Sequence, residues 1–325
     1  MPFGIGLAGL GIHGARYARH LIRGDVPGAR LVAVCRRDET AGRSFADEHG
    51  IHYVREVGEL AARPEVDGVV LVLPPDLHGP AALTVLGEGK PLLVEKPLAA
   101  TRAAALEVVT QLERTAGWLM VGHTLRFDDV VRRLRDQVAD LGALRLVAIS
   151  QRFEPATRGW LDEPGPGGIL LNTGVHGFDL LRYLTGLEAS SVGAVCSRST
   201  TRRTDDGFAG TLSLDPGNVL ATLDNVRATD SRSGRIEIVG EHGQLWGDHV
   251  HRTLVRVRGK ETTDLGPVPA NATIPATLAA FVRGVRDAAE PAIAAADGLA
   301  AVELVEAAEL AAREGRRVEL DEIRS

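Results

Sequence analysis

Cysteine is scarce in this sequence, which contains only Cys35 and Cys196, far apart along the chain. Two distant cysteines do not form a disulfide framework, so we expect a protein of the reducing cytoplasm. The sequence also begins directly with a strand-like pattern, without the charged and apolar regions of a signal peptide. Both observations predict a cytoplasmic location.

Long hydrophobic runs and an excess of positive charge are also lacking. No apolar stretch approaches the roughly 20 residues that a membrane-spanning helix needs. The formal net charge is −6 and the isoelectric point is about 6.0, so no membrane or nucleic acid is expected as a partner. The composition, 44% hydrophobic and 25% charged, is ordinary for a soluble globular protein. The 325 residues predict about two domains.

A glycine-rich turn separates the first predicted strand, Phe3 to Ala8, from the first predicted helix, Ala15 to Ile22. The turn, Gly9-Leu10-Gly11-Ile12-His13-Gly14, has the spacing G-x-G-x-x-G. Glycines at these positions allow a tight turn and let backbone N–H groups approach a pyrophosphate at the helix N-terminus. The alternative is a tight turn that binds nothing. We predict dinucleotide binding through Gly9, Gly11, Ile12, His13 and Gly14.

Two arginines follow the second predicted strand, Arg30 to Cys35. Domains that prefer NAD usually place an acidic residue here, on the ribose hydroxyls, whereas this chain has Arg36 and Arg37. Asp38 is better interpreted as the N-cap of a helix from Glu39 to His49. Arginines suit a 2′-phosphate, and the alternative is a solvated surface pair. The sequence therefore predicts NADP as the cofactor, with NAD as the alternative.

A third strand, Val69 to Leu73, ends at Pro74-Pro75-Asp76-Leu77-His78. The prolines stop the strand and are expected to stiffen a loop beside the ligand crevice. We predict that Leu73, Pro74 and His78 contact the cofactor. The alternative for His78 is to cap a helix that begins near Pro80.

The stretch Pro91 to Pro97 predicts a buried strand that ends at Glu95-Lys96-Pro97, because proline cannot continue a central strand. The carboxyl ends of parallel strands border the ligand crevice, so Lys96 is expected at its mouth. The alternative is a surface lysine paired with Glu95. A helix from Thr101 to Thr115 and a strand from Trp118 to Val121 complete a doubly wound parallel sheet for residues 1–122.

The pattern changes after Gly122. A helix is predicted from Asp128 to Asp140, a strand from Leu144 to Phe153, and a final helix from about Gly298 to Arg313. Alternating segments, including 211–214, 219–223, 235–239 and 253–257, predict antiparallel strands. Residues 123–325 are therefore expected to form an α+β domain with a mainly antiparallel, open-faced sheet. His249 and His251 have strand spacing, and no carboxylate or cysteine is arranged around them as a metal site would need, so we predict surface histidines and no metal site.

A helix predicted from Leu171 to Leu184 carries an unusual polar face. At about 100° per residue, Asn172, His176, Asp179 and Tyr183 fall on one side of it and apolar residues on the other. An amide, an imidazole, a carboxylate and a phenol together suggest a ligand-facing edge. A solvated polar face is the alternative.

Taken together, these stretches resemble the Gfo/Idh/MocA family of oxidoreductases over nearly the whole chain. The matching elements are the glycine loop at 9–14, the segments 74–78, 95–97 and 174–179, Ile238 to Gly243, and the closing helix before residues 314–316. The resemblance implies that Lys96 and His176 are catalytic, that Asp179 binds substrate, and that the second domain carries a homodimer or homotetramer contact. Many family dehydrogenases have an aspartate where this chain has Asn172.

The resulting hypothesis is an NAD(P)-dependent oxidoreductase that acts on a sugar, a cyclic polyol or a related hydroxy or keto compound. His176 would act as general base and Lys96 would stabilise charge on the substrate oxygen. Contacts to substrate or cofactor are expected from a further set, namely Asn172, Asp179, Arg126, Arg158, Trp160 and Glu95. The alternatives are a nucleotide-bound sensor without turnover, which Asn172 favours, and a redox-neutral NAD-dependent glycosidase.

Overall fold

The computed structural model of the chain describes residues 1–155, 159–164, 167–217 and 219–325, which form two compact units. The first unit contains residues 1–124 and 272–299, and the second contains residues 125–271 and 300–325. The chain first passes from one unit to the other after residue 124, two residues beyond the predicted boundary at 122. The return of residues 272–299 to the first unit departs from the predicted continuous second domain.

The physical reason for this return is aromatic packing. Helix α8, Thr273–Arg286, places Phe281 edge-on to Phe3, with 5.8 Å between ring centroids, and against Trp118 at 5.6 Å. The Trp118 indole also donates a hydrogen bond of 2.8 Å to the Ala289 carbonyl. These residues are far apart in the sequence, so no local pattern indicated that they meet.

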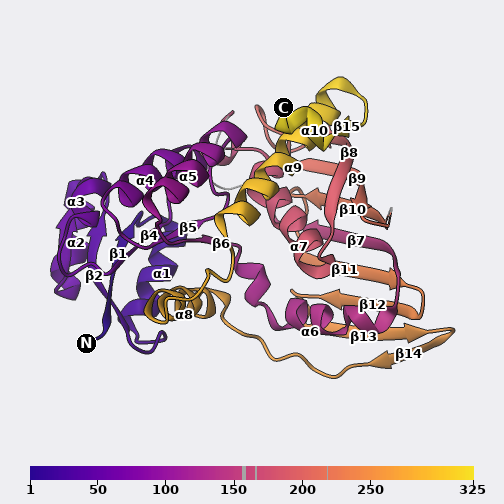
Figure 1. Cartoon of the computed structure of the whole chain (residues 1–325), viewed down its shortest axis with the longest axis horizontal. Coiled ribbons are helices and arrows are strands. Elements are labelled where there is room, and N and C mark those ends of the chain that lie inside the picture. The colour runs from indigo at the N-terminus through magenta and orange to yellow at the C-terminus, as the bar shows by residue number, and fades with distance from the viewer. Residues whose placement is uncertain (156–158, 165–166, 218) are drawn as a thin grey trace. The chain divides into compact units, whose positions relative to one another are not determined.

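The sheet of the first unit is parallel and six-stranded, in the order β3-β2-β1-β4-β5-β6 (Figure 1). The order reverses between β1 and β4, and in such sheets ligands bind beside the carboxyl ends of the strands at this reversal. Every residue of β1, β4, β5 and β6 is buried, as their apolar runs predict. The strands are β1 Phe3–Ala8, β2 Ala29–Cys35, β3 His52–Val54, β4 Gly68–Leu71, β5 Leu92–Glu95 and β6 Leu119–Gly122.

Helices α1 Ile12–Ile22, α2 Glu39–His49, α3 Val57–Ala61, α4 Pro75–Gly87 and α5 Arg102–Thr115 alternate with these strands, and Figure 1 shows α4 and α5 side by side. The Asp38 side chain accepts a hydrogen bond of 3.1 Å from the Ala41 N–H, which confirms Asp38 as the N-cap of α2. The predicted stiff loop at 74–78 is wrong, because α4 already begins at Pro75. Proline suits the first helical position, where its missing N–H needs no partner.

The sheet of the second unit is nine-stranded, in the order β14-β13-β12-β11-β7-β10-β9-β8-β15 (Figure 1). All neighbouring strands are antiparallel except β7 and β10, which run parallel, so the expected mainly antiparallel sheet is confirmed. The strands are β7 Leu144–Arg152, β8 Glu188–Ser197, β9 Gly207–Asp215, β10 Val219–Val226, β11 Ser233–Gly240, β12 Gly243–Asp248, β13 Thr253–Arg258, β14 Glu261–Asp264 and β15 Val318–Glu319.

Helices α6, Asp129–Gln137, and α7, Val175–Thr185, pack on one face of this sheet. The predicted helix 171–184 begins instead as a π-helical turn, η4 Leu170–Gly174, and continues as α7 Val175–Thr185. Helix α6, Asp129–Gln137, is shorter than predicted, because residues 138–141 form the 3₁₀ turn η2, Val138–Leu141. The other elements are η1 Thr124–Phe127, η3 Gly159–Asp162, α9 Ala295–Glu314 and α10 Leu320–Arg324.

The opposite face of the sheet carries exposed apolar residues. Along β10, Val219, Ala221 and Leu223 are buried, whereas Leu220 between them is 55% exposed. Trp246 on β12 is 40% exposed and Val195 on β8 is 66% exposed. One face of the sheet therefore contributes to the core, and the other presents apolar side chains to solvent.

Candidate functional site

The glycine loop has the geometry that a bound dinucleotide requires. Gly9 has a φ of +101°, and a Cβ there would lie 2.1 Å from the Val72 carbonyl oxygen. A Cβ on Gly14 would lie 1.9 Å from the Gly9 carbonyl oxygen. Gly11, the N-cap of α1, has no atom within 4 Å of its Cβ position and no side-chain cap. Two glycines thus permit tight packing, and the third leaves the helix N-terminus open to a pyrophosphate.

The predicted 2′-phosphate site lies directly after β2. Arg36 is partly exposed and Arg37 is exposed, and an Arg36 guanidinium nitrogen lies 3.7 Å from an Asp38 carboxylate oxygen. The Tyr53 hydroxyl donates a hydrogen bond of 3.0 Å to the Arg36 carbonyl, which fixes the backbone at this point. Both guanidinium groups therefore remain accessible to an anionic ligand.

Lys96 follows a buried carboxylate that three other residues hold in place. Glu95 is 4% exposed, and the Lys96 N–H donates to its Oε2 at 3.1 Å. Its other oxygen, Oε1, accepts a hydrogen bond from the Tyr17 hydroxyl and lies 2.9 Å from His13 Nε2. The glycine loop, helix α1 and the end of β5 are thereby joined through one carboxylate. The Lys96–Pro97 peptide bond is cis.

This arrangement keeps Glu95 ionised. Burial opposes ionisation, but the His13 hydrogen bond, the charges of His13 and Lys96 and the Tyr17 hydrogen bond outweigh it and lower the pKa of Glu95 to about 2. Burial and the adjacent Glu95 carboxylate raise the pKa of Tyr17 well above its usual value, so Tyr17 remains a hydrogen-bond donor. A negative charge therefore stands beside Lys96 at neutral pH.

The His78 imidazole is inaccessible to a cofactor, contrary to the predicted contact. Its side chain is 1% exposed, with Nδ1 at 2.6 Å from the Pro97 carbonyl oxygen and Nε2 at 2.9 Å from the Leu73 carbonyl oxygen. The alternative role as a cap does not apply either, since His78 lies within α4. Leu73 and Pro74 are partly exposed at the exit of β4, as a contact to a cofactor would require.

In the second unit, the polar face predicted on 171–184 exists in altered form. Asn172 is 8% exposed, and its Nδ2 donates a hydrogen bond of 3.0 Å to the Gly168 carbonyl. Because Asn172 lies in the π-helical turn, it is not at α-helical spacing from His176. His176 is partly exposed, near the start of α7. The alternative of a solvated polar face is wrong, since Asn172 and Asp179 are buried.

Asp179 forms a buried ion pair that the sequence did not indicate. It is 1% exposed, and Arg126 Nε lies 3.1 and 3.0 Å from its two oxygens, with Nη2 at 2.6 Å from Oδ1. The Arg126 guanidinium also lies 5.1 Å from the centroid of the Tyr183 ring, which Arg135 approaches to 4.2 Å. Asp179 thus orients Arg126, and the two predicted substrate contacts form one unit.

The remaining predicted contacts come from a separate segment. Trp160 is partly exposed in η3, and Arg158 lies outside the described residues. Sequence reasoning missed Tyr17, whose hydroxyl reaches Glu95, and Arg227, which donates a hydrogen bond of 2.5 Å to the Thr173 hydroxyl beside Asn172. Helical spacing does place Tyr17 four residues after His13, and this is the one signal that could have found it.

The structure gathers the predicted residues into two groups, one in each unit. Lys96 belongs to the first unit with the glycine loop, and His176 belongs to the second with Asn172, Asp179 and Arg126. Within the described ranges, no three His, Cys, Asp or Glu side chains are grouped as metal ligands. His249 is not a surface histidine as predicted, because its ring packs over Gly234.

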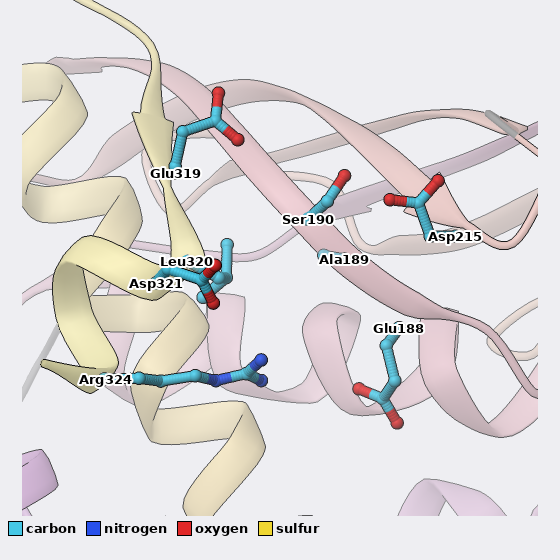
Figure 2. A pocket seen from close by; sticks show the side chains of 8 residues that line it. All are labelled: Glu188, Ala189, Ser190, Asp215, Glu319, Leu320, Asp321 and Arg324. Carbon is cyan, nitrogen blue, oxygen red and sulfur yellow. The ribbon is translucent and has the colours of Figure 1, made fainter.

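A hollow of about 250 Å³ lies elsewhere in the second unit, lined by Glu188, Ala189, Ser190, Asp215, Glu319, Leu320, Asp321 and Arg324 (Figure 2). The carboxylates of Glu188, Asp215 and Glu319 point in different directions in Figure 2 and do not converge on one position. The Glu188 carboxylate is also paired with Arg182 at 2.7 Å. The hollow contains none of the predicted site residues.

None of the helices in the described ranges has both the length and the apolar character needed to cross a membrane.

Comparison with known proteins matches both parts of the chain to one family. Residues 3–123 match the profile of an oxidoreductase family with an NAD-binding Rossmann fold, and residues 135–320 match the C-terminal α/β domain of that family. The rhizopine catabolism protein MocA of Rhizobium meliloti is 29% identical over 99% of both chains. Inositol 2-dehydrogenase 1 of Saccharopolyspora erythraea is 32% identical over 80% of this chain and 78% of its own.

Solved structures agree with these matches. A probable dehydrogenase from Thermotoga maritima superposes with a TM-score of 0.86 at 25% identity, over 99% of this chain and all of its own. The fold and the dinucleotide-binding loop are those of an NAD-binding oxidoreductase. The chain belongs to the Gfo/Idh/MocA family of oxidoreductases, as the resemblance predicted.

Proposed function

We propose that the chain is an NADP(H)-dependent enzyme that transfers a hydride between nicotinamide and a sugar, a cyclic polyol or a related hydroxy or keto compound. The observation that carries the proposal is the network around Glu95, which ties Lys96 to the glycine loop that receives the cofactor. Residues 1–122, joined by residues 272–299, would bind the cofactor. The rest of residues 123–325 would bind the substrate and make the oligomer contact.

The proposed chemistry divides between two side chains. The bound nicotinamide supplies the hydride acceptor or donor. In the oxidative direction, His176 takes the proton of the substrate hydroxyl as general base. Lys96 holds the same oxygen through its ammonium group and stabilises the negative charge that develops there. Bound to the same oxygen, the Lys96 cation would favour the neutral form of His176, which a base requires.

The choice of NADP rests on Arg36 and Arg37. Arg36 and Arg37 directly follow β2, at the place where an acidic residue would select the 2′-hydroxyl of NAD. The hydrogen bond from Tyr53 fixes the Arg36 backbone, so the Arg36 side chain leaves the main chain at a defined position. A planar guanidinium matches the oxygen atoms of a 2′-phosphate.

The substrate class rests on the group around Arg126 and on the relatives. Arg126, held by Asp179, offers N–H donors in a fixed orientation, and Asn172 adds an amide. Trp160 supplies an aromatic surface of the kind that packs against a sugar ring. One relative is named as an inositol dehydrogenase, which supports a polyol substrate.

Assembly is the remaining element of the proposal. The exposed face of the nine-stranded sheet carries Val195, Leu220 and Trp246, and a hollow of about 440 Å³ lies on it between β8 and β10. Apolar patches of this kind on a soluble protein mark interaction surfaces. We therefore propose a homodimer or homotetramer joined through these faces.

The decisive experiment replaces Lys96 by methionine and His176 by alanine. Both variants are expected to bind NADPH nearly as the unmodified protein does, because the glycine loop and Arg36 are intact, and to lose turnover by orders of magnitude. Exposed Lys260, in the turn between β13 and β14, provides the matched control Lys260→Met. Turnover is followed by nicotinamide absorbance over a panel of sugars and polyols.

Near-normal turnover in both variants would refute the assigned roles. A second candidate function is a cofactor-bound sensor without turnover. It is favoured by Asn172, which supplies no charge and whose amide hydrogen-bonds the Gly168 carbonyl. Tight cofactor binding without turnover on any compound of the panel would support this alternative.

A further inference from the structure

His78 lies between two backbone carbonyl groups that belong to different parts of the crevice edge. Its Nδ1 is 2.6 Å from the Pro97 carbonyl oxygen, directly after Lys96, and its Nε2 is 2.9 Å from the Leu73 carbonyl oxygen, at the exit of β4. A histidine that only filled space in the core would not require an acceptor at both ring nitrogens. The ring thus lies between the segment that follows β4 and the segment that follows β5.

Carbonyl oxygens only accept hydrogen bonds, and a neutral imidazole donates only one. Donation to both carbonyls requires the imidazolium form. Burial lowers the pKa of His78, whereas the hydrogen bond to Pro97, the Glu95 carboxylate and the hydrogen bond to Leu73 raise it and the Lys96 charge lowers it. The net direction is downward, so the neutral ring donates to one carbonyl at a time.

We propose that His78 is a positioning residue, which ties the Lys96–Pro97 turn to the Leu73 segment and so fixes the catalytic lysine relative to the cofactor crevice. The inference rests on the proposed role of Lys96. It assigns to His78 no contact with substrate or cofactor, in line with its 1% exposure. In one tautomer the ring donates to the Pro97 carbonyl and in the other to the Leu73 carbonyl, so the two hydrogen bonds have separable effects, one on the lysine and one on the cofactor edge.

Two conservative substitutions separate these effects. The asparagine amide lies two bonds from Cβ, as Nδ1 does, so His78→Asn retains a donor to the Pro97 carbonyl. The glutamine amide lies three bonds from Cβ, as Nε2 does, so His78→Gln retains a donor to the Leu73 carbonyl. His78→Leu retains neither and serves as the reference for complete loss.

One readout needs no substrate. Lys90 and Lys260 are the only other lysines of the chain, so trace acetylation followed by mass spectrometry reports the reactivity of Lys96 against two internal references. We expect His78→Leu and His78→Gln to shift the relative reactivity of Lys96 by about threefold or more. We expect His78→Asn to leave it near that of the unmodified protein. A change of threefold corresponds to less than 1 kcal/mol, within the range of a single hydrogen bond.

Cofactor affinity and turnover should respond differently in the asparagine and glutamine variants. His78→Asn is expected to weaken NADPH binding several-fold and to preserve kcat on any substrate that turns over. His78→Gln is expected to preserve the NADPH Kd and to lower kcat by about tenfold, with little change in KM. A merely structural role predicts equal losses of stability in both variants and no such split.

The proposal is overturned if the asparagine and glutamine variants are indistinguishable in Lys96 reactivity and in NADPH affinity. It is also overturned if His78→Leu folds and matches the unmodified protein in both. Should His78→Leu fail to fold, the comparison of asparagine with glutamine still decides. Should no substrate turn over, the function proposed above fails, but acetylation and NADPH affinity still test His78.

Discussion

Replacing Glu95 by glutamine tests the network that holds Lys96. The substitution preserves shape and removes the charge that accepts hydrogen bonds from Tyr17, His13 and the Lys96 backbone. In the variant, the new amide N–H₂ either faces the Lys96 N–H, where two donors meet, or faces the donors of Tyr17 and His13. We expect the variant to be less stable at pH 7.

The magnitude follows from the pKa of Glu95. It lies at about 2 in the folded chain against 4.5 for an ordinary glutamate, and at 1.36 kcal/mol for each pH unit the difference amounts to about 3 kcal/mol. Because the folded pKa is the lower one, this stability is fully present above pH 4.5 and is lost as the pH falls from 4.5 to 2. At pH 3 about 1.4 kcal/mol remains, so the stability difference between the two proteins should shrink by about 2 kcal/mol between pH 7 and pH 3.

Equilibrium urea unfolding measures this difference. Fluorescence of Trp118 reports the first unit when Trp160 and Trp246 are replaced by phenylalanine in every protein compared. Glu107→Gln, at an exposed position on α5, is the control and should leave both stability and its pH dependence unchanged. A stability difference that stays constant from pH 7 to pH 3 would refute the assigned charge state of Glu95.

Three further predictions concern cofactor, assembly and the amide of Asn172. Arg36→Asp should reverse a preference for NADPH over NADH, and in the unmodified protein that preference should shrink at high salt; equal Kd values for the two cofactors would contradict the 2′-phosphate site. Leu220→Glu should convert a homo-oligomer into smaller species by light scattering, and a monomer before substitution would contradict the interface. Asn172→Asp should maintain or raise kcat and shift its pH profile, because a carboxylate favours the imidazolium of His176; an unchanged profile would show that Asn172 does not act on His176.

The sequence specified the first unit well because its signals are local. The glycine loop, the apolar strands and the proline after Lys96 each determine the backbone within a few residues, and the reversal of strand order follows from right-handed connections. The same locality explains the failures. Tyr17 meets Glu95 across 78 positions, and Phe281 meets Phe3 across the whole unit, so both contacts depend on the completed fold.

The second unit was predicted less completely for a related reason. Helical periodicity correctly grouped His176, Asp179 and Tyr183, but it assumes 3.6 residues per turn and could not indicate the π-helical turn that holds Asn172. Periodicity also leaves open whether a polar residue faces solvent or a partner. The burial of Asp179 follows from Arg126, which lies 53 positions earlier and has no sequence signal linking it to that helix.

The Arg126–Asp179 pair raises the question of whether it serves stability or substrate binding, and a double-mutant cycle separates the two. Asp179 is 1% exposed, so Arg126→Met leaves a buried carboxylate without its main cation, and Asp179→Leu leaves the guanidinium without its anion. Each single change should destabilise the second unit by roughly 3–5 kcal/mol. Apolar side chains at both positions remove the charges together, so the double variant should be far more stable than the sum of the single losses predicts.

The double variant then decides the role of Arg126. If Arg126 binds substrate, the double variant folds and binds NADPH but shows a strongly raised KM, since no donor replaces the guanidinium. If the pair only stabilises the fold, the double variant keeps both stability and KM. Additive stability losses in the cycle would instead show that the two side chains act independently. Their bidentate contact at 2.6–3.1 Å predicts the opposite result, a strong coupling between the two substitutions. The fold tolerates removal of a whole buried pair better than removal of half of it, so the double variant can be assayed. An unchanged KM in that variant would assign Arg126 to stability and remove it from the substrate site.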